Sequence, residues 1–418
     1  MIIRGGAPLR GTVELSGSKN AALPCLMAAL LTDQPVLVHN VPRLRDVRTS
    51  IDLLGRLGVV SRWAGDHDVE LHARTITSHE APYDLVKTMR ASFLVLGPLL
   101  ARAGRARVST PGGCAIGARP VNLHIAGMRM FGARIQMRHG YVEAHAGLLH
   151  GARVWLDSPS VGATENIMMA AVRARGHTSI ENAAREPEVQ DLARMLTTMG
   201  ARISGAGSHV IEIEGVDRLG GAEHTVIPDR IEAGSLMIAA AVTGGDVVVR
   251  GAPVGHLEAV IAKLREIGVT VESVADGLRV ARGAALRPVE LRTLPYPGFP
   301  TDLQAQMMAL LTQAAGTSVT ETIFENRFMH ALELMRMGAD IVMKGPTAVV
   351  RGPTVLCGAP VMATDLRASM GLILAGLAAE NSTELSRVYH LDRGYEALDT
   401  KLRALGATVE RVPDEEAA

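Results

Sequence analysis

The sequence carries one pattern six times. A helix-like segment that ends in a large apolar residue followed by glycine recurs about every 70 residues along the 418-residue chain. The six pairs are Leu57-Gly58, Phe131-Gly132, Met199-Gly200, Ile267-Gly268, Met337-Gly338 and Leu405-Gly406. A regular internal repeat means that each unit buries its apolar face against its neighbours, so this feature constrains the fold more than any other.

The segment before each glycine has the spacing of an amphipathic helix. The third repeat places its apolar residues on one helical face, namely Val189, Leu192, Leu196 and Met199. The fourth and sixth repeats do the same with Leu257, Val260, Leu264 and Ile267, and with Tyr395, Leu398, Leu402 and Leu405. Charged residues such as Asp191 and Arg194 lie between the apolar positions and are expected to face solvent.

A second helix precedes the amphipathic one in every repeat, and it is apolar nearly all round, which predicts burial. These segments are 21–31, 91–101, 167–172, 234–242, 307–311 and 370–379. Short β-branched stretches separate the helices. Each repeat therefore reads as a buried helix, a strand, a surface helix and a further strand or hairpin. We predict an α/β protein of two domains, each with three repeats and a ring of sheets around buried helices. A linear solenoid is the alternative.

Composition excludes several classes of function. Lys plus Arg and Asp plus Glu number 43 each, and this neutrality argues against a nucleic-acid binder. No apolar run is long enough to span a bilayer, and the N-terminus lacks the apolar core of a signal peptide. Three cysteines are too few for a disulfide scaffold, so a cytoplasmic location is expected. No metal-ligand spacing occurs among the His and Cys residues, so neither a metal nor an organic cofactor is expected.

The starts of the predicted buried helices carry unusual residues. Ser, Thr and Asp are suitable N-caps there, and capping alone would explain Thr301-Asp302 and Thr364-Asp365. Capping does not explain the cations at the same places, because positive charge is unfavourable at a helix N-terminus. These cations are Lys19, Arg90, Arg230 and Arg367. Cations beside exposed amide groups form an anion site, so we expect an anionic substrate with phosphate or carboxylate groups.

Two further deviations from the repeat involve Arg119 and Arg393, and the glycine-rich segment around Cys114. Arg119 and Arg393 occupy equivalent positions before the glycines of the second and last repeats, and could face each other across a cleft. Cys114 lies in a glycine-rich segment, which suits a mobile loop that approaches a ligand closely. Its thiol is a candidate proton donor or nucleophile. Cys25 and Cys357 lie in apolar surroundings and are expected to be small buried hydrophobes.

Together these motifs resemble the UDP-N-acetylglucosamine enolpyruvyl transferases (1-carboxyvinyltransferases) of the EPSP synthase family, over essentially residues 5–409. The matching segments are Ser16 to Pro24, Cys114 to His124, Ser160 to Asn166, Pro228 to Gly234, Phe299 to Asp302, Phe324 to His330, Thr364 to Ser369 and Asp392 to Glu396. The resemblance implies a two-domain inside-out α/β barrel. It implies one domain of residues 20–227, a second of residues 1–19 and 228–418, and an active site in the cleft between them.

The resemblance implies transfer of the enolpyruvyl group of phosphoenolpyruvate to the 3′-hydroxyl of UDP-N-acetylglucosamine with release of phosphate, the first committed step of peptidoglycan synthesis. In the family pattern Cys114 is the general acid, Asp302 is the base or hydroxyl-positioning carboxylate, and Asp365 and Arg367 have supporting roles. The residues implied to hold phosphoenolpyruvate are Lys19, Asn20, Arg119 and Arg393, with Lys19 and Arg393 also counted as catalytic. Those implied to line the sugar-nucleotide site are Asn20, Arg90, Arg119, Pro120, Val121, Asn122, Leu123, Ser160, Val161, Gly162, Asp302, Ile323 and Arg327.

Departures from the family pattern touch the uridine and diphosphate side of the implied site. Leu94 stands where some members have Trp, Asn122 where Asp is common, and Ser158 where some have Lys. Cys114 is kept where some members have Asp, which predicts inactivation by the epoxide fosfomycin.

Three other functions compete with this interpretation. The shikimate-pathway enolpyruvyl transferases typically have Lys-Ser in the first motif and no Cys in the glycine-rich loop, whereas this chain has Lys19-Asn20 and Cys114. A non-catalytic UDP-sugar-binding paralogue should lack at least one of the four catalytic residues, and all four are present. A repeat scaffold for protein partners would leave the cations at the helix starts unexplained. No protein partner is implied.

Overall fold

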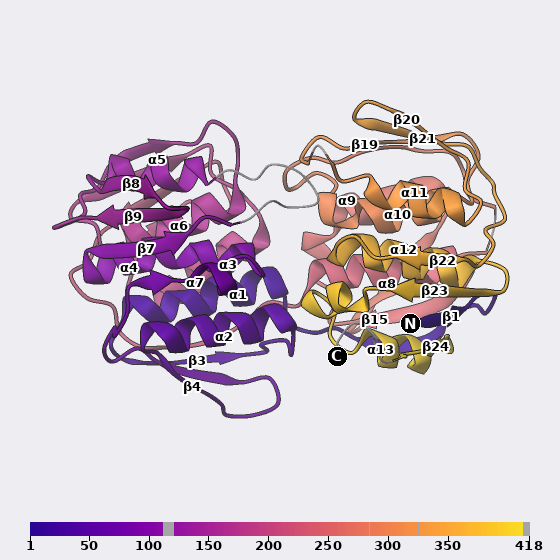
Figure 1. The fold of residues 1–418 in the computed structure, drawn as a ribbon. Helices are drawn as coiled ribbons and strands as arrows, with labels where there is room; N and C mark the ends of the chain where they lie inside the picture. Colours follow the sequence, from indigo (N-terminus) through magenta and orange to yellow (C-terminus); the bar gives the residue numbers. More distant parts are fainter. Residues whose placement is uncertain (112–120, 284, 325, 413–418) are drawn as a thin grey trace. The chain divides into compact units, whose positions relative to one another are not determined.

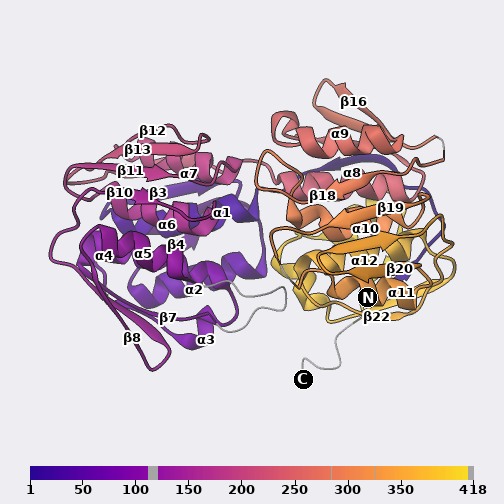
Figure 2. The same ribbon diagram turned by 90° about the horizontal axis from the view of Figure 1, so that it is seen from above.

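The computed structural model describes residues 1–111, 121–283, 285–324 and 326–412. The chain divides into two compact units (Figures 1 and 2). The Lys19 unit comprises the described residues of 17–227, and the Asp302 unit comprises those of 1–16 and 228–412. Lys19 thus belongs with the residues that follow it rather than with the first 16.

Each unit contains three four-stranded sheets among its described residues. In the Lys19 unit the orders are β14(Ala222–Thr225)–β3(Pro35–His39)–β5(Val69–His72)–β4(Val60–Trp63), β6(Glu80–Ala81)–β7(Arg105–Ser109)–β9(Tyr141–His145)–β8(Arg134–Arg138) and β10(Arg153–Trp155)–β11(His177–Glu181)–β13(Val210–Glu214)–β12(Arg202–Ser204). In the Asp302 unit they are β2(Arg10–Glu14)–β15(Asp246–Arg250)–β17(Gly277–Ala281)–β16(Thr270–Val274), β18(Glu290–Arg292)–β19(Thr317–Thr320)–β21(Thr347–Val350)–β20(Ile341–Lys344) and β22(Pro360–Met362)–β23(Ser382–Ser386)–β1(Ile2–Arg4)–β24(Thr408–Glu410).

All six sheets share one pairing pattern, which confirms the sequence repeat. The first pair in each order is parallel and the next two pairs are antiparallel. Two sheets depend on strands distant in sequence. Strand β1 lies between β23 and β24, and β2 pairs with β15. Figure 1 accordingly places β1 beside the last strands of the chain. The N-terminal strands therefore complete sheets of the Asp302 unit.

The predicted buried helices are confirmed in both units. Those of the Lys19 unit are α1(Lys19–Ala28), continued by η1(Ala29–Leu31), then η2(Arg90–Val95) leading into α4(Leu96–Ala103), and α6(Val161–Ala171). Those of the Asp302 unit are α8(Arg230–Val242), η4(Thr301–Leu303) leading into α10(Gln304–Leu311), and α12(Leu366–Ala378). Every residue of α8 is buried. Helices α8, α10 and α12 each contact the other two, and in Figure 1 they lie between the sheets of their unit. This closed trio differs from a linear solenoid, whose first and third repeats do not touch.

The amphipathic helices are also confirmed. They are α2(Arg45–Leu57), α5(Asn122–Met130), α7(Pro187–Thr198), α9(Glu258–Ile267), α11(Met329–Arg336) and α13(Leu398–Ala404). The remaining helical turns are α3(Tyr83–Val86), η3(Val254–His256) and η5(Val388–Arg393). All twelve apolar positions predicted for the third, fourth and sixth repeats are buried. The six repeat glycines all have a positive φ, between 88° and 103°, a conformation that only glycine adopts at little cost.

Two expectations about single residues are wrong. Cys357 is exposed, because it lies in the connection before β22, where Leu356 supplies the buried side chain. Asp191 was expected to face solvent, but it is fully buried in α7. Its carboxylate accepts hydrogen bonds from Arg194 and from the backbone N–H of Ile227, at 2.8 and 3.4 Å. The helical period predicted the core face of α7 but not this polar contact at its edge.

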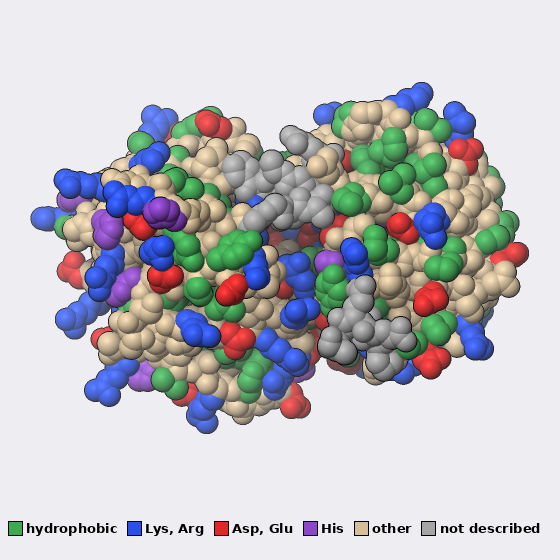
Figure 3. All heavy atoms as spheres, viewed as in Figure 1, with side chains coloured by type: hydrophobic (Ala, Val, Ile, Leu, Met, Phe, Trp, Pro, Cys, Tyr) green, Lys and Arg blue, Asp and Glu red, His purple; other side chains and the backbone are tan. Residues whose placement is uncertain are grey.

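Each unit has its own hydrophobic core. No helix in the described part of the chain combines the length and apolar character needed to cross a bilayer. On the face shown in Figure 3, Lys and Arg side chains are interspersed with Asp and Glu, as the balanced composition predicts.

Candidate active site

Lys19 opens helix α1 of the Lys19 unit. The preceding Ser18 is the N-cap, and its hydroxyl accepts a hydrogen bond from the N–H of Ala21. The Lys19 ammonium lies 2.9 Å from Oδ2 of Asp46, in the first turn of α2, and both residues are buried. A cation at the first position of a helix is opposed by the helix dipole, and this carboxylate offsets that cost. Sequence reasoning missed Asp46, since the repeat pattern gives no sign that α2 reaches Lys19.

Three elements of the same unit gather residues expected to bind the sugar nucleotide. Arg90 begins η2, Asn122 and Leu123 begin α5, and the segment 160–162 begins α6. Ser160 is the N-cap of α6, and its hydroxyl accepts from the N–H of Ala163 at 3.4 Å. The half-buried start of α6 therefore presents backbone N–H groups, which suit an anionic ligand.

His124, in α5, is linked to α6 and η2 through the side chain of Asn166. Nδ2 of Asn166 donates to Nδ1 of His124 at 2.9 Å and to the carbonyl of Phe93 at 3.0 Å, while Oδ1 of Asn166 accepts from the N–H of Gly97 at 2.7 Å. A Cβ placed on Gly162 would lie 3.4 Å from Cε1 of His124, so the imidazole edge faces the start of α6.

The imidazole of His124 is neutral at physiological pH. Burial first, and then the charge of Arg90, lowers its pKa to about 3. Because Nδ1 accepts a hydrogen bond, the proton of the neutral ring is on Nε2, which is left as a donor. The sequence placed His124 at the end of a motif, but its partners Asn166 and Phe93 become visible only in the fold.

Asp302 lies between two arginines in the Asp302 unit. Its Oδ1 accepts from Arg327 at 2.8 Å, and its Oδ2 accepts from Nε of Arg367 at 3.1 Å and lies 3.0 Å from Nη2 of the same arginine. Both arginines are buried, whereas the Asp302 side chain is 24% exposed. Burial by itself lowers the pKa of Arg367, but the negative charge of Asp302, together with Tyr395 and Asp229, raises that pKa above its ordinary value. The structure thus brings together three residues that the sequence singled out.

A second buried carboxylate, Glu321, supports this cluster. Its Oε2 accepts from the hydroxyl of Thr301, which in turn accepts from Nη1 of Arg327. Its Oε1 accepts from Thr293 and from the backbone N–H groups of Ile323 and Phe324. Glu321 therefore fixes both the start of η4 and the Ile323 backbone. It has no counterpart in the repeat pattern, and sequence reasoning missed it.

The acidic residues at the helix starts have different roles. Asp365 caps α12, and its Oδ1 accepts from the N–H groups of Arg367 and Ala368 at 2.8 and 3.0 Å. Asp229 caps α8 in the same way, through Ile231 and Glu232. The capping interpretation is therefore right for Asp365. It is wrong for Asp302, because the chain enters α10 through the 3₁₀ turn η4, whose N-cap is Pro300 and makes no side-chain capping bond.

The remaining expected site residues are less constrained. Asn20, in the first turn of α1, and Arg393, at the end of η5, are partly exposed. Element η5 packs against α12, the helix that carries Arg367. Leu94 lies in the core of the Lys19 unit, whereas Asn122 and Ser158 are exposed. Cys114, Arg119 and Pro120 lie outside the described residues.

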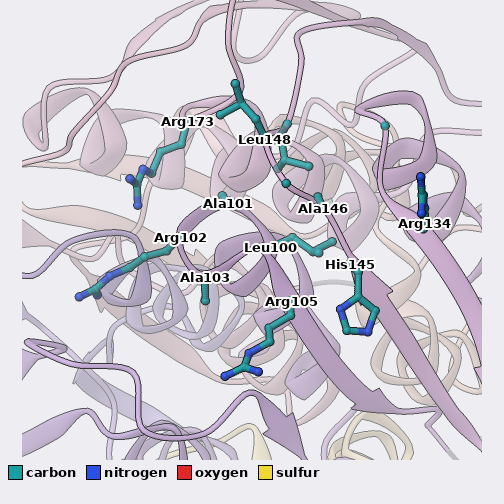
Figure 4. A pocket seen from close by; sticks show the side chains of 14 residues that line it. Leu100, Ala101, Arg102, Ala103, Arg105, Arg134, His145, Ala146, Leu148 and Arg173 are labelled. Atoms are coloured by element: carbon teal, nitrogen blue, oxygen red, sulfur yellow. The ribbon is translucent and has the colours of Figure 1, made fainter.

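A basic cavity in the Lys19 unit contains none of the expected site residues (Figure 4). Its charged lining residues are Arg102, Arg105, Arg134, His145 and Arg173. In Figure 4 Arg102 and Arg173 point to one side, whereas His145 and Arg134 lie toward the other. Arg102 also donates to the carbonyl groups of Leu30, Thr32 and Arg74. The side chains do not converge on one point, so the cavity is not the predicted site.

Comparison with known proteins identifies the family. The sequence family described as EPSP synthase (3-phosphoshikimate 1-carboxyvinyltransferase) matches residues 3–402. The chain belongs to the EPSP synthase family. It is 58% identical to a protein of Maricaulis maris and 56% identical to one of Geotalea daltonii, with 99% of each chain covered. Both relatives are named UDP-N-acetylglucosamine 1-carboxyvinyltransferase.

Solved structures agree with this assignment. The enolpyruvyl transferase NikO from Streptomyces tendae superposes with a TM-score of 0.88 at 27% identity, over 97% of each chain. An EPSP synthase from Acinetobacter baumannii gives a TM-score of 0.75 at 20% identity over 98% of each chain, which supports the fold alone. The predicted two-domain α/β fold is confirmed, and the chain is a transferase enzyme.

Proposed function

We propose that the chain transfers the enolpyruvyl group of phosphoenolpyruvate to the 3′-hydroxyl of UDP-N-acetylglucosamine and releases phosphate, as the first committed step of peptidoglycan synthesis in the cytoplasm. The observation that carries the proposal is the Asp302–Arg327–Arg367 cluster, in a chain whose relatives at 54 to 58% identity share one name. The proposed substrates are small molecules, and the proposal includes no nucleic acid, membrane or obligate protein partner.

Asp302 is the proposed base or hydroxyl-positioning group. A carboxylate that accepts from two arginines stays ionised, so it can accept a hydrogen bond from the attacking hydroxyl. The hydroxyl oxygen then forms a bond to C2 of phosphoenolpyruvate, while C3 receives a proton. Loss of phosphate and of a proton from C3 completes the addition and elimination. Cys114 is the proposed donor of the C3 proton.

Several cations bind the anionic groups of the substrates in this proposal. Lys19, Asn20, Arg119 and Arg393 hold phosphoenolpyruvate, because its phosphate and carboxylate need charge-assisted hydrogen bonds. Arg90, the segment 119–123, the start of α6, Ile323 and Arg327 bind the sugar nucleotide. The N–H groups at the start of α6 and the Nε2–H of His124 support this assignment, since both are donors.

The direct test is phosphate release from phosphoenolpyruvate with UDP-N-acetylglucosamine or, separately, shikimate 3-phosphate as acceptor. We expect release only with the UDP-sugar. Release only with shikimate 3-phosphate would overturn the acceptor while keeping the reaction class. Release with neither would favour a UDP-sugar-binding paralogue without catalytic activity.

Inhibition by fosfomycin tests the proposed role of Cys114 independently of which acceptor substrate the enzyme uses. We expect the drug to inactivate the natural chain through the Cys114 thiolate and to spare an active Cys114→Asp variant, which has no thiol to alkylate. Equal inhibition of both chains would exclude Cys114 as the target. Mass spectrometry of the treated protein gives an independent readout, because the adduct adds mass only where the thiol is present.

A further inference from the structure

Three side chains far apart in sequence meet inside the Lys19 unit. Cys25 lies in α1, Asp191 in α7 and His224 in β14, and their ligand atoms all lie within 4.8 Å of one another. Helix α7 packs against both α1 and β14, and Figure 1 shows α1 and α7 side by side. No residue of this group belongs to the proposed active site, so the enolpyruvyl transfer does not explain why they converge.

His224 supplies an independent observation that points to a ligand. Its side chain is 9% exposed, and Nε2 lies 3.2 Å from Oδ1 of Asp191. Nevertheless, among the residues that the structure describes, this nitrogen has no hydrogen-bond partner of suitable geometry. A buried ring nitrogen without a partner is costly, and a bound cation would satisfy it.

We propose that Cys25, Asp191 and His224 form a binding site for a thiophilic divalent cation, with Zn²⁺ as the natural occupant. Thiolate, imidazole and carboxylate are all ligands of Zn²⁺, and three protein ligands leave a fourth tetrahedral position for water. Mg²⁺ and Ca²⁺ prefer sites made of oxygen atoms, so the thiol argues against them.

The distance between His224 and Asp191 suits a tetrahedral ion, and the Cys25 sulfur lies within 4.8 Å of both ligand atoms. With metal–ligand bonds of about 2.0–2.1 Å, two ligands of a tetrahedron lie roughly 3.3 Å apart. The 3.2 Å between Nε2 of His224 and Oδ1 of Asp191 is close to that spacing, and these two atoms make no hydrogen bond with each other. Strand β14 is at the edge of its sheet, and the His224 side chain keeps 9% of its surface exposed.

The charges balance when the cation replaces a proton. The thiolate is the form of cysteine that binds a metal, so binding takes a proton from the Cys25 thiol. Binding converts Cys25–SH and Zn²⁺ into a Cys25–S–Zn unit and a released proton, and the Asp191 carboxylate neutralises the remaining positive charge. Arg194 and the N–H of Ile227 already hold that carboxylate, as groups around a metal ligand commonly do.

Such an ion would join α1, α7 and β14 at one point. Helix α1 begins with Lys19 and Asn20, and β14 leads to Ile227, after which the chain enters the Asp302 unit. The expected role of the ion is therefore structural, since it would fix the helix that carries two of the proposed substrate-binding residues.

Cobalt is a suitable probe, because a thiolate bound to Co²⁺ gives a charge-transfer band in the near ultraviolet. A full-length chain with Cys114→Ser and Cys357→Ser keeps Cys25 as its only thiol. We expect this chain to bind one Co²⁺ with such a band, and Zn²⁺ to displace it. Absence of the band, or of stoichiometric binding, would overturn the proposal.

Two histidine variants in the same background give a matched comparison. His224→Gln should weaken Co²⁺ binding by about tenfold or more, whereas His139→Gln, in the exposed turn between β8 and β9, should leave it unchanged. Circular dichroism checks that each variant is folded. Equal affinity of the His224→Gln and His139→Gln chains would contradict the site, and so would retention of the band in a folded Cys25→Ser variant. None of these readouts depends on enolpyruvyl transfer, so this proposal and the proposed function can fail separately.

Discussion

The starts of α10 and α12 carry the same dipeptide and use it differently. Thr301-Asp302 and Thr364-Asp365 both precede a buried helix, and N-capping alone would account for both, although the family resemblance implies a catalytic role for Asp302. Asp365 turns back onto the amide groups of its own helix. Asp302 instead reaches two arginines from elsewhere in the chain. One aspartate completes secondary structure, and the other is paired with two buried arginines, which suits the role that we propose for it.

The largest expected effect is on catalysis at Asp302. Asp302→Asn keeps the shape of the side chain but removes the charge that accepts the hydroxyl proton, so we expect kcat to fall roughly 10²- to 10⁴-fold. Steady-state phosphate release measures this. A fall in stability should accompany it, since Arg327 and Arg367 lose a counter-charge. An unfolding curve shows whether the protein is still folded, and activity near that of the natural chain would contradict the proposed role.

A substitution at Glu321 tests whether the surrounding hydrogen bonds cause Asp302 and Asp365 to make different contacts. Glu321→Gln leaves a donor facing the hydroxyl of Thr301 or the N–H of Ile323, and we expect a loss of about 1–3 kcal/mol in the free energy of unfolding. The KM for the UDP-sugar should also rise, because Ile323 loses its anchor. Chemical denaturation and kinetics measure the two effects.

The matched control for that variant is Glu384→Gln, on an exposed position of β23. It should change stability by less than about 0.5 kcal/mol. Equal destabilisation by the two substitutions would show that the Glu321 network contributes nothing specific.

His124 is the opposite case to Asp302, because it is a buried ionisable group that is neutral. Its folded pKa of about 3 lies below the unfolded value, so between these values the unfolded chain binds more protons. Stability should therefore fall by up to about 1.4 kcal/mol for each pH unit below roughly 6.5, from this residue alone. His124→Gln should reduce that slope, as measured by denaturation between pH 4 and 7. An unchanged slope of stability against pH in the His124→Gln variant would mean that His124 is not buried as a neutral ring. The control is His139→Gln, on an exposed turn, which should leave the slope unchanged.

The smallest expected effect is at the cap of α12. Asp365→Ala should cost about 1 kcal/mol of stability, because the N–H groups of Arg367 and Ala368 lose their acceptor. Asp365→Asn should restore most of this, since asparagine is also a good N-cap. Thermal unfolding of the two variants shows whether Asp365 stabilises α12 as a hydrogen-bond acceptor or through its negative charge. If Asn destabilises as much as Ala, the carboxylate acts through its charge instead.

The regular parts of this molecule were predictable from sequence, because each depends on a local pattern. The glycine ends of the helices follow from the left-handed conformation, and the buried stripe of α7 follows from its helical period. The strand pairings of β1 and β2 did not follow from any local pattern, since their partners lie far along the chain.

The candidate site was predictable only where a residue breaks its own repeat. Lys19 and Arg367 are cations at helix starts, where positive charge is unfavourable, and this marked them. Asp302 was marked only by the family resemblance, because capping would explain an aspartate at that position. Asp46, which pairs with Lys19, and Glu321, which holds the hydroxyl of Thr301 beside Asp302, look ordinary in sequence and matter only because the fold brings them near. The same limit explains Asp191, Cys25 and His224, since no spacing in the sequence relates residues on three separate elements.

The most direct test compares Asp302→Asn with Asp365→Asn in one phosphate-release assay with UDP-N-acetylglucosamine and phosphoenolpyruvate. The substitutions are chemically identical, and each removes one carboxylate charge from the start of a buried helix. We predict that kcat/KM falls at least a hundredfold more for Asp302→Asn than for Asp365→Asn. Equal losses in two folded variants would contradict the account, because the two aspartates would then be interchangeable.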